Sequence, residues 1–377
     1  MNNKNKLKIL LVTPLYPPEI GGPATYTKFL EENLSKDQFD IEVVRFSEVK
    51  HLPYIIRHIV FFWKIFWRAK YTDIVYALDP LGTGVPAGIA AKLRSKKFLL
   101  RIAGDRAWET AQQKFGITES LDTFSASKKY SLGIRLLKRG QTFCASLADT
   151  IIVPGNYLRD IVTNWGINKG KIATIYNAFI SATVPEEKTA LRDSFGFSGT
   201  VLFSAGRVVV WKGFEELIRM MPEVLGQIEN AKLYIAGDGP DKERLEKIVH
   251  ELGLDGKVIF FGILPKEKLL RAIKAADIFV LNTFYEGFSH QLLEAMEVGT
   301  PVVSTTSGGN PELIESEKDG LLVPYNNRQA LLRAIVRMVN EEGLANHFSK
   351  EAQEKVLQFS VERAISEFIQ EAKKLIY

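Results

Sequence analysis

Apolar positions along the chain recur in two rhythms that alternate with each other. Short, nearly continuous apolar runs, such as VLFSA at residues 201–205 and IFVLN at residues 278–282, are typical of strands in parallel sheets that are covered on both faces. Between these runs lie longer stretches with apolar residues at helical spacing. This alternation predicts an α/β fold.

The alternating pattern occurs twice. Strands are expected at residues 7–13, 41–46, 74–77, 98–102 and 150–154, and again at residues 200–205, 232–237, 258–261, 278–282 and 301–304. The segment ISATVPEEK at residues 180–188 breaks the periodicity between the two sets. We therefore predict two Rossmann-like, doubly wound domains at residues 1–180 and 181–357, with a helix at about 358–377 packing back on the first. Ligands of such sheets bind outside the carboxyl ends of the strands, so the site is expected in a cleft between the domains.

Length and cysteine content agree with this organisation. A chain of 377 residues is long enough for two cores. The single cysteine, Cys144, excludes an internal disulfide, and no Cys/His cluster has zinc-ligand spacing. Near the amino end, the apolar run Ile9–Val12 is followed at once by Thr13 and Pro14, which favours a buried strand over a signal peptide. A cytoplasmic protein is expected.

Charge is distributed unevenly. Residues 1–180 hold 26 Lys and Arg against 15 Asp and Glu, whereas residues 181–377 hold 23 against 29. A basic first half suits nucleic acid, an anionic membrane or a phosphorylated substrate, and charge alone does not choose among them.

The segment at residues 51–70 combines aromatic, aliphatic and basic residues. It is too interrupted by charge to cross a bilayer. One interpretation is an interfacial helix on an anionic membrane, with Ile55, Ile59, Phe62 and Phe66 on one face and Arg57, Lys64 and Arg68 elsewhere. The other interpretation is a core helix with a solvated basic side, and the two interpretations are compatible with each other. Nucleic acid is disfavoured because the aromatics have helical spacing instead of forming a stacking platform.

Candidate chemistry is concentrated at residues 282–309, where a strand is followed by a loop and a helix. Ser289 is a plausible helix cap, and Gly287, Phe288 and Ser289 place backbone N–H groups where a phosphate is stabilised. Glu286 lies in the loop and Glu294 inside the helix. Two separated carboxylates suit the hydroxyls of a nucleotide-sugar better than they suit the pair of a retaining glycosidase, which lies about 5 Å apart.

Two cations, Arg207 and Lys212, follow the first strand of the second domain and could stabilise a departing diphosphate without a metal. Gly237 belongs to an AGDGP turn that has Lys242 where a dinucleotide fingerprint requires its third glycine, which disfavours an NAD site. Gly21 and Gly22, after the first strand of the chain, allow close backbone approach.

The run E-G-F-S-H-Q-L-L-E-A-M-E-x-G-x-P-V-V resembles the E-x7-E signature of family 4 retaining glycosyltransferases with the GT-B fold. Further elements occur in the expected order, so the resemblance covers essentially the whole chain. It implies that the first domain binds the acceptor and the second the donor. It also implies that Glu286 contacts the donor sugar and Glu294 the ribose, while Arg207 and Lys212 hold the phosphates.

The resemblance extends to the neighbouring loops. Gly21 and Gly22 resemble the glycine loop beside the phosphates, Gly237 resembles a structural turn near the nucleotide, and Gly262, Ile263 and Leu264 resemble the loop whose backbone reads the base edge. His290 stands where the signature often has Leu or Val. It could contact acceptor or donor, or be structural.

One region departs from the family pattern. Many members carry a histidine near the sugar where this chain has Gly104, followed by Asp105. The run G-D-x-x-W-E resembles a subgroup of bacterial polysaccharide-assembly transferases. Asp105 is then expected to bind a sugar hydroxyl or accept the acceptor's proton, and Trp108 to offer a flat face to a sugar ring. The alternative for Asp105 is a loop aspartate that caps a helix.

Together these observations predict a retaining, metal-independent transferase of a hexose-type sugar from a UDP- or GDP-sugar. The acceptor is a saccharide or polyprenyl-linked saccharide in cell-surface polysaccharide or glycolipid assembly. No D-x-D metal motif occurs, and no cofactor is expected beyond the co-substrate. The protein is expected to lie peripherally on the inner face of the membrane through residues 51–70. The alternatives are a non-catalytic nucleotide-sugar-binding module and another GT-B enzyme such as a nucleotide-sugar epimerase.

Overall fold

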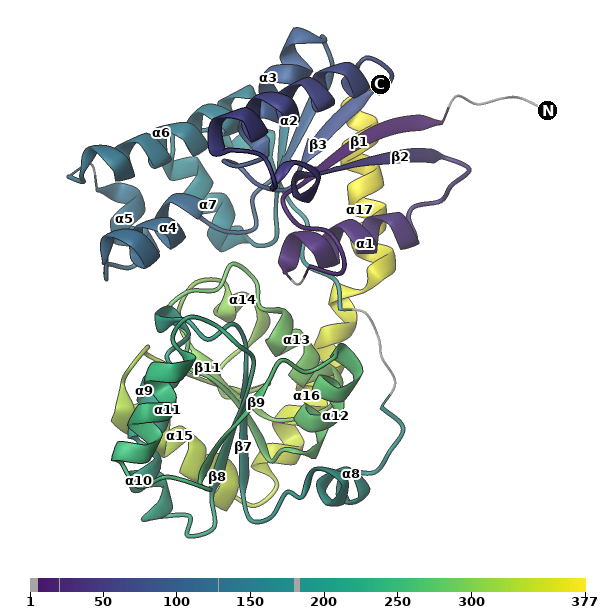
Figure 1. The fold of residues 1–377 in the computed structure, drawn as a ribbon. Coiled ribbons are helices and arrows are strands. Elements are labelled where there is room, and N and C mark those ends of the chain that lie inside the picture. Colours follow the sequence, from purple (N-terminus) through teal and green to yellow (C-terminus); the bar gives the residue numbers. More distant parts are fainter. Residues whose placement is uncertain (1–5, 20, 128, 180–183) are drawn as a thin grey trace. The chain divides into compact units, whose positions relative to one another are not determined.

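The computed structural model describes residues 6–19, 21–127, 129–179 and 184–377, and it divides into two compact units. The first unit comprises residues 1–176 together with 361–377, and the second comprises residues 177–360. Each unit is a parallel sheet flanked by helices (Figure 1). The boundary expected at residues 180 and 181 falls outside the described residues.

The first sheet has the strand order β2-β1-β3-β4-β5-β6, with every neighbouring pair parallel. Its strands are β1 (Leu7–Thr13), β2 (Phe39–Arg45), β3 (Ile74–Ala77), β4 (Lys97–Arg101), β5 (Thr150–Val153) and β6 (Ile172–Thr174). Its helices are α1 (Gly22–Asn33), α2 (Tyr54–Ala69), α3 (Gly84–Leu93), α4 (Arg106–Phe115), α5 (Leu121–Ala126), α6 (Leu132–Leu147), α7 (Asn156–Asn164) and α17 (Val361–Lys374).

Helices cover this sheet on both faces. Tyr76 of β3 stacks on Phe368 of α17, with ring centroids 5.5 Å apart, and meets Tyr26 of α1 at 6.4 Å. Because successive side chains of a strand point to opposite faces, Val75 points the other way. Phe98, which pairs with Val75 in the sheet, lies against Gly88 of α3. Helices α2, α3 and α6 lie side by side on this second face (Figure 1).

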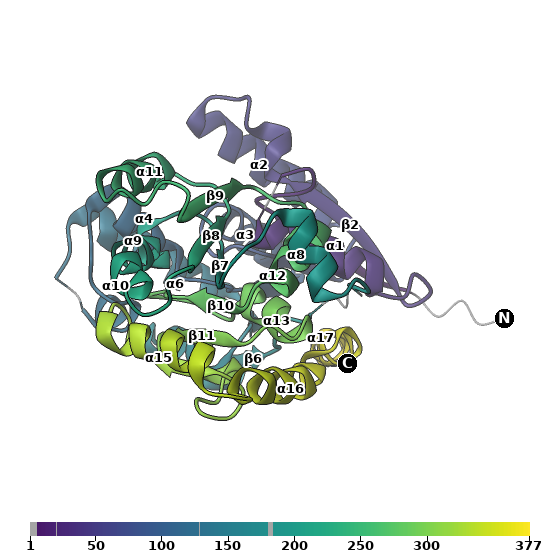
Figure 2. The same cartoon turned by 90° about the horizontal axis from the view of Figure 1, so that it is seen from below.

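The second sheet has the strand order β12-β11-β10-β7-β8-β9, again all parallel, and most of this order can be followed in Figure 2. Its strands are β7 (Val201–Ala205), β8 (Lys232–Ala236), β9 (Val258–Gly262), β10 (Ile278–Leu281), β11 (Val302–Thr305) and β12 (Leu321–Val323). Its helices are α8 (Lys188–Phe195), α9 (Phe214–Arg219), α10 (Met221–Leu225), α11 (Lys242–Glu251), α12 (Lys266–Ala275), α13 (His290–Glu297), α14 (Asn310–Leu313), α15 (Arg328–Asn340) and α16 (Leu344–Val356).

The predicted α/β class and the ten predicted strands are confirmed. Each expected strand begins and ends within about two residues of an observed one. Two further strands, β6 and β12, were not expected from the sequence, and each is three residues long. A run that short carries too few apolar positions to show a period.

Helix α4 begins where a buried aspartate caps it. Asp105 has no exposed surface, and its Oδ1 accepts a hydrogen bond from the Trp108 backbone N–H at 2.9 Å and another from the Gln141 side-chain amide at 3.0 Å. The second oxygen, Oδ2, has no hydrogen-bond partner among the described residues. Desolvation by burial raises the pKa of Asp105 to about 6.

This cap should make the stability of the protein depend on pH. Because the folded-state pKa lies above the ordinary value of 3.8, the stabilisation is complete below about pH 4 and is lost as pH rises through about 6. At about 1.4 kcal/mol per pKa unit, the loss is on the order of 3 kcal/mol. Asp105→Asn keeps a capping oxygen but does not titrate. The difference between its free energy of unfolding and that of the wild type, measured by urea titration, should therefore shift in favour of the variant as pH rises from 4.5 to 7.5.

The matched variant is Asp105→Ala, which removes the cap and should cost about 1 kcal/mol or more at low pH. Alanine does not titrate either, so the deficit of this variant relative to the wild type should shrink as pH rises through about 6. Parallel stability curves for the wild type and Asp105→Asn across this range would contradict the raised pKa.

Candidate active site

The strand order of the second unit creates a crevice at its centre. Strand β7 lies beside β10, and the chain continues from β7 toward β8 and β9 but from β10 toward β11 and β12. The loops that follow β7 and β10 therefore diverge, and ligands of doubly wound sheets bind at such a switch point. The loop after β7 carries Arg207 and Lys212, and the loop after β10 carries Glu286. The topology brings together residues that lie far apart in the sequence.

An ion pair spans this switch point. The ammonium group of Lys212 contacts the Glu286 carboxylate, and the two side chains are only 12% and 13% exposed. Gly213 follows Lys212 with a φ of 64°, and a Cβ at this position would collide with the Asn282 carbonyl at the end of β10. Only glycine combines this left-handed conformation with so close an approach. The two loops are thus joined by backbone packing as well as by charge.

The segment from Glu286 to Ser289 is held from both sides. Ser289 caps α13, and its Oγ accepts from the Leu292 backbone N–H at 3.3 Å, as expected for a helix cap. On the other side, the Gly309 N–H donates to the Glu286 carbonyl at 2.8 Å. A Cβ at Gly308 or Gly309 would collide with the Glu286 or Gly287 backbone. The start of α13 therefore keeps one geometry.

Glu294 lies inside α13 and is buried, with 11% of its side chain exposed. One oxygen pairs with the ammonium group of Lys266, the first residue of α12. The other oxygen, Oε2, is buried without a hydrogen-bond partner among the described residues. Desolvation by burial raises the pKa of Glu294, and Lys266 opposes that shift. A buried acceptor without a donor is costly, and a ligand hydroxyl would satisfy it.

The remaining predicted residues of this unit lie on the loops after β7, β8 and β9. Backbone hydrogen bonds join these loops, among them Gly206 N–H to the Ala236 carbonyl at 3.0 Å, Val208 N–H to the Asp238 carbonyl at 2.9 Å, and Gly237 N–H to the Gly262 carbonyl at 2.7 Å. Gly237 leaves no room for a Cβ beside the Gly206 carbonyl. Its role here is to let two loops approach each other.

Three side chains on these loops differ in their exposure. Arg207 is exposed and forms no ion pair with any residue that the structure describes. Ile263 is 58% exposed, whereas Leu264 is half-buried. A solvent-facing guanidinium without a carboxylate partner is available to an anion.

The first unit has its own switch point, because β1 lies beside β3. Gly21 and Gly22 end the loop after β1: Gly21 is the N-cap residue of α1 and Gly22 its first residue. The Thr25 N–H donates to the Gly21 carbonyl at 3.1 Å. The two glycines therefore lie at a helix amino end.

Two side chains that the sequence placed near the sugar are enclosed in the structure. Asp105 is the cap of α4, which is the alternative that the sequence left open. Trp108 has no exposed surface, and its indole N–H donates to the Glu119 carbonyl at 2.9 Å. Neither side chain can contact a sugar in this conformation. The sugar contacts that the sequence predicted for Asp105 and Trp108 are therefore not supported by this structure. His290 is half-buried as the first residue of α13.

Sequence reasoning missed three contributors to this site. Lys266 is one of many lysines in the chain, and only the fold shows that it lies against Glu294. Gly308 and Gly309 follow a strand as an S-G-G run, a pattern that could have indicated close backbone approach.

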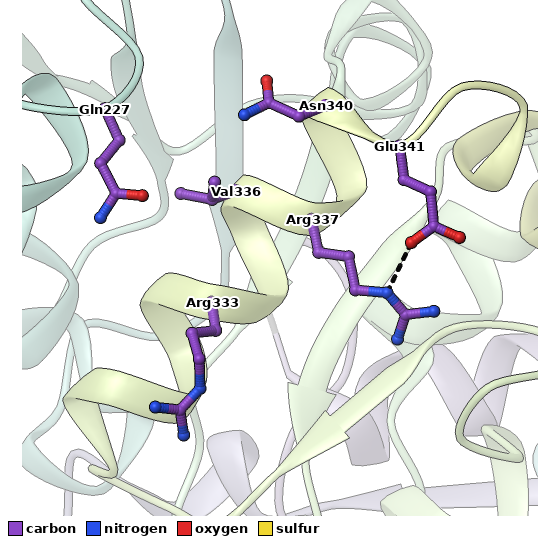
Figure 3. Close-up of a pocket in the computed structure, with 6 residues that line it drawn as sticks. All are labelled: Gln227, Arg333, Val336, Arg337, Asn340 and Glu341. Atoms are coloured by element: carbon purple, nitrogen blue, oxygen red, sulfur yellow. Dashed lines mark hydrogen bonds and ion pairs between the residues drawn. The ribbon is translucent and has the colours of Figure 1, made fainter.

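A separate cavity of about 500 Å³ lies elsewhere in the second unit, lined by Gln227, Arg333, Val336, Arg337, Asn340 and Glu341 (Figure 3). Gln227 precedes β8, so this cavity lies at the amino ends of the strands. Arg337 in its wall is paired with Glu341 at 2.7 Å and with Glu317. The predicted donor residues are not among those that line it.

The chain is similar to known proteins in its second unit alone and over nearly its whole length. Residues 188–355 match the family model described as "Glycosyl transferases group 1". The chain is 27% identical over 93% of its length to the glycosyltransferase MJ1607 of Methanocaldococcus jannaschii, of which 93% is covered. It is 32% identical over 45% of its length to the lipopolysaccharide core biosynthesis glycosyltransferase LpsE of Rhizobium meliloti, of which 48% is covered.

Among solved structures, Anabaena HepE in complex with UDP-glucose is similar over 98% of this chain and 100% of its own, with a TM-score of 0.77 and 19% identity. The two parallel six-stranded sheets and this likeness show the GT-B fold, as predicted. Residues 188–355 of the second unit are thus similar to group 1 glycosyltransferases, and the chain is a glycosyltransferase enzyme.

Proposed function

We propose that this glycosyltransferase is retaining and metal-independent, and that it transfers a hexose-type sugar from a UDP- or GDP-sugar to a saccharide or lipid-linked saccharide. The observation that carries the proposal is the group of charged residues at the switch point of the second sheet, where Lys212 and Glu286 pair and the exposed Arg207 lies on the same loop as Lys212. The HepE complex with UDP-glucose supports a uridine donor, and LpsE supports a role in cell-surface polysaccharide or glycolipid assembly.

Each charged group has a defined task in this proposal. Arg207 and Lys212 stabilise the departing diphosphate, together with the N–H groups at the start of α13. Glu286 accepts hydrogen bonds from sugar hydroxyls once Lys212 turns to the phosphate. The free Oε2 of Glu294 accepts from the ribose. Gly262, Ile263 and Leu264 offer backbone groups to the base, and Gly21 and Gly22 approach the phosphates.

The reaction step needs no protein base. The acceptor hydroxyl attacks the anomeric carbon on the face from which the diphosphate departs, so configuration is retained. The bond between the anomeric carbon and the phosphate oxygen breaks, and the departing phosphate oxygen takes the hydroxyl proton. Asp105 takes no part, because it is enclosed as a helix cap.

The donor class can be found by thermal shift with UDP-, GDP- and ADP-sugars, since a ligand that binds only the folded state raises the melting temperature. Release of nucleoside diphosphate is then measured with a saccharide acceptor, and the anomeric configuration of the product by NMR. Binding without transfer would identify a non-catalytic binding module, and an altered donor sugar would identify an epimerase. An inverted product would contradict retention.

Removing either member of the central ion pair should abolish most of the transfer activity. Lys212→Met removes a cation that stabilises the leaving group, and we expect the rate to fall by roughly 100-fold or more. Glu286→Gln should lower it similarly. Lys247→Met is the matched control, because Lys247 is exposed on α11 of the same unit. Rates within a few-fold of wild type for both site variants would refute the assignment.

The transfer rate should be unchanged by EDTA. Arg207 and Lys212 supply the positive charge that a divalent cation supplies in metal-dependent transferases. The measurement compares rates in EDTA with rates in added Mg²⁺ or Mn²⁺, and a strict requirement for manganese would contradict metal independence.

Lys266 should keep Glu294 ionised for the ribose. In Lys266→Met the buried carboxylate loses its cation, so its pKa rises further and a larger fraction of it is protonated at a given pH. Donor affinity of this variant should therefore increase with rising pH more steeply than that of the wild type. Lys268→Met, an exposed position on the same helix, is the control. Identical pH profiles for all three proteins would exclude this role.

The proposal also places the protein peripherally on the inner face of the membrane through residues 51–70. No helix in the part of the chain that the structure describes is long and apolar enough to cross a bilayer.

A further inference from the structure

Helix α2 is apolar on the side that faces solvent. Its buried side is formed by Phe61, Ile65 and Ala69, at a spacing of four residues. Its exposed side has the same spacing and is also apolar: Ile55 is 72% exposed, Ile59 53%, Trp63 47% and Trp67 59%. A helix at the surface of a domain normally presents polar residues to water. We call these four exposed side chains the α2 ridge.

The cations of α2 do not form its solvent-facing side. At 100° per residue, Lys64 and Arg68 lie to one side of the α2 ridge. Lys64 pairs with Glu48 at 2.6 Å, and Arg68 pairs with Glu42 at 3.2 Å. The solvated basic side that the sequence left open is therefore replaced by an apolar side with compensated cations at its margin.

The neighbouring helices continue this surface. Helix α3 packs between α2 and α6 (Figure 1). These neighbours add four exposed apolar side chains, at Leu93, Leu132, Leu136 and Phe143. They also add cations: Arg135 and Arg139 are exposed on α6. Arg94 lies over the rings of Phe66 and Trp67, at 3.7 and 5.0 Å.

Acidic residues are absent from all three helices. Neither α2, α3 nor α6 contains an aspartate or a glutamate along its length. Helices α1 and α17, on the opposite face of the same sheet, both contain glutamates. One face of the first unit thus combines exposed apolar side chains with positive charge, and its other face does not.

We propose that the surface formed by α2, α3 and α6 binds an anionic lipid bilayer, with the α2 ridge inserted among the headgroups. This rests on the proposed function, whose lipid-linked acceptor would lie in the same bilayer. Tryptophan is suited to the boundary between headgroups and acyl chains, because its ring is apolar and its N–H is polar. The exposed arginines complement anionic lipid headgroups.

A second copy of the chain fits this surface less well than a bilayer does. A symmetric dimer through the same face would bring cations against cations, since the three helices offer no carboxylate to the partner copy. A bilayer with acidic lipids provides negative charge for Arg135 and Arg139, the exposed arginines of α6.

The test uses the full chain and vesicles of phosphatidylcholine, with or without about a third of phosphatidylglycerol. Wild-type protein should cosediment with the anionic vesicles at low salt, and 1 M KCl should weaken the binding without abolishing it. The double variant Trp63→Ser/Trp67→Ser should bind at least 10-fold more weakly. Leu357→Ser is the matched control, because Leu357 is an exposed apolar residue of the second unit.

Insertion can be read out separately from binding. Bilayer binding should shift tryptophan emission to the blue and allow quenching by brominated lipids in the wild type but not in the double variant. Absence of binding to anionic vesicles at low salt would overturn the inference, and so would equal binding by the double variant. A dimer in sedimentation velocity that depends on Trp63 and Trp67, without vesicle binding, would overturn it in favour of self-association.

Nucleotide binding separates this inference from the proposed function. The double variant should show the same thermal shift with nucleoside diphosphate as the wild type, because its substitutions lie outside the donor site. Loss of vesicle binding with an intact thermal shift would support the surface. A wild-type protein that binds vesicles but shows no transfer with any donor would refute the proposed function and leave the surface standing.

Discussion

The ion pair between Lys212 and Glu286 joins two loops that leave the centre of the second sheet in opposite directions. Both side chains are largely enclosed, so either charge alone would be buried without compensation, which is strongly destabilising. Close backbone approaches at three glycines hold these loops together around the ion pair. Gly213 lets the loop after β7 reach the end of β10, and Gly308 and Gly309 let a further loop lie against Glu286. The site is thus built from backbone contacts that only glycine permits, with charged side chains placed between them.

Most of the fold could be predicted from the sequence because parallel strands covered on both faces must be apolar along their length. That constraint produces runs such as residues 278–282, which are visible without any structure. Strands β6 and β12 lie at the edges of their sheets and are three residues long, so they leave no such run. The edge strands β2 and β9 are longer, at seven and five residues, and they were predicted, so strand length decided which strands the sequence shows.

Only some residues of the candidate site could be predicted from the sequence. Glu286, Glu294, Arg207 and Lys212 follow from one local motif and from the position of cations after a strand. Whether a side chain is buried cannot be predicted from such a motif. Asp105 and Trp108 occupy a loop-to-helix junction that suits a binding site, yet both side chains are buried. Lys266 shows the converse, because its importance arises from a contact with a residue 28 positions away. In α2, the sequence showed both cations and aromatics, and only the structure shows that Trp63 and Trp67 face solvent while Phe61 is buried and Phe62 and Phe66 are half-buried.

Under the proposed function, the pairing of each donor-site carboxylate with its own lysine bears on the end of the catalytic cycle. A nucleoside diphosphate that remains after transfer holds Lys212 away from Glu286, while the sugar hydroxyls that satisfied Glu286 have departed. The carboxylate then competes within the protein for the same ammonium group. The empty site returns to a charge-balanced state without recruiting ions from solvent.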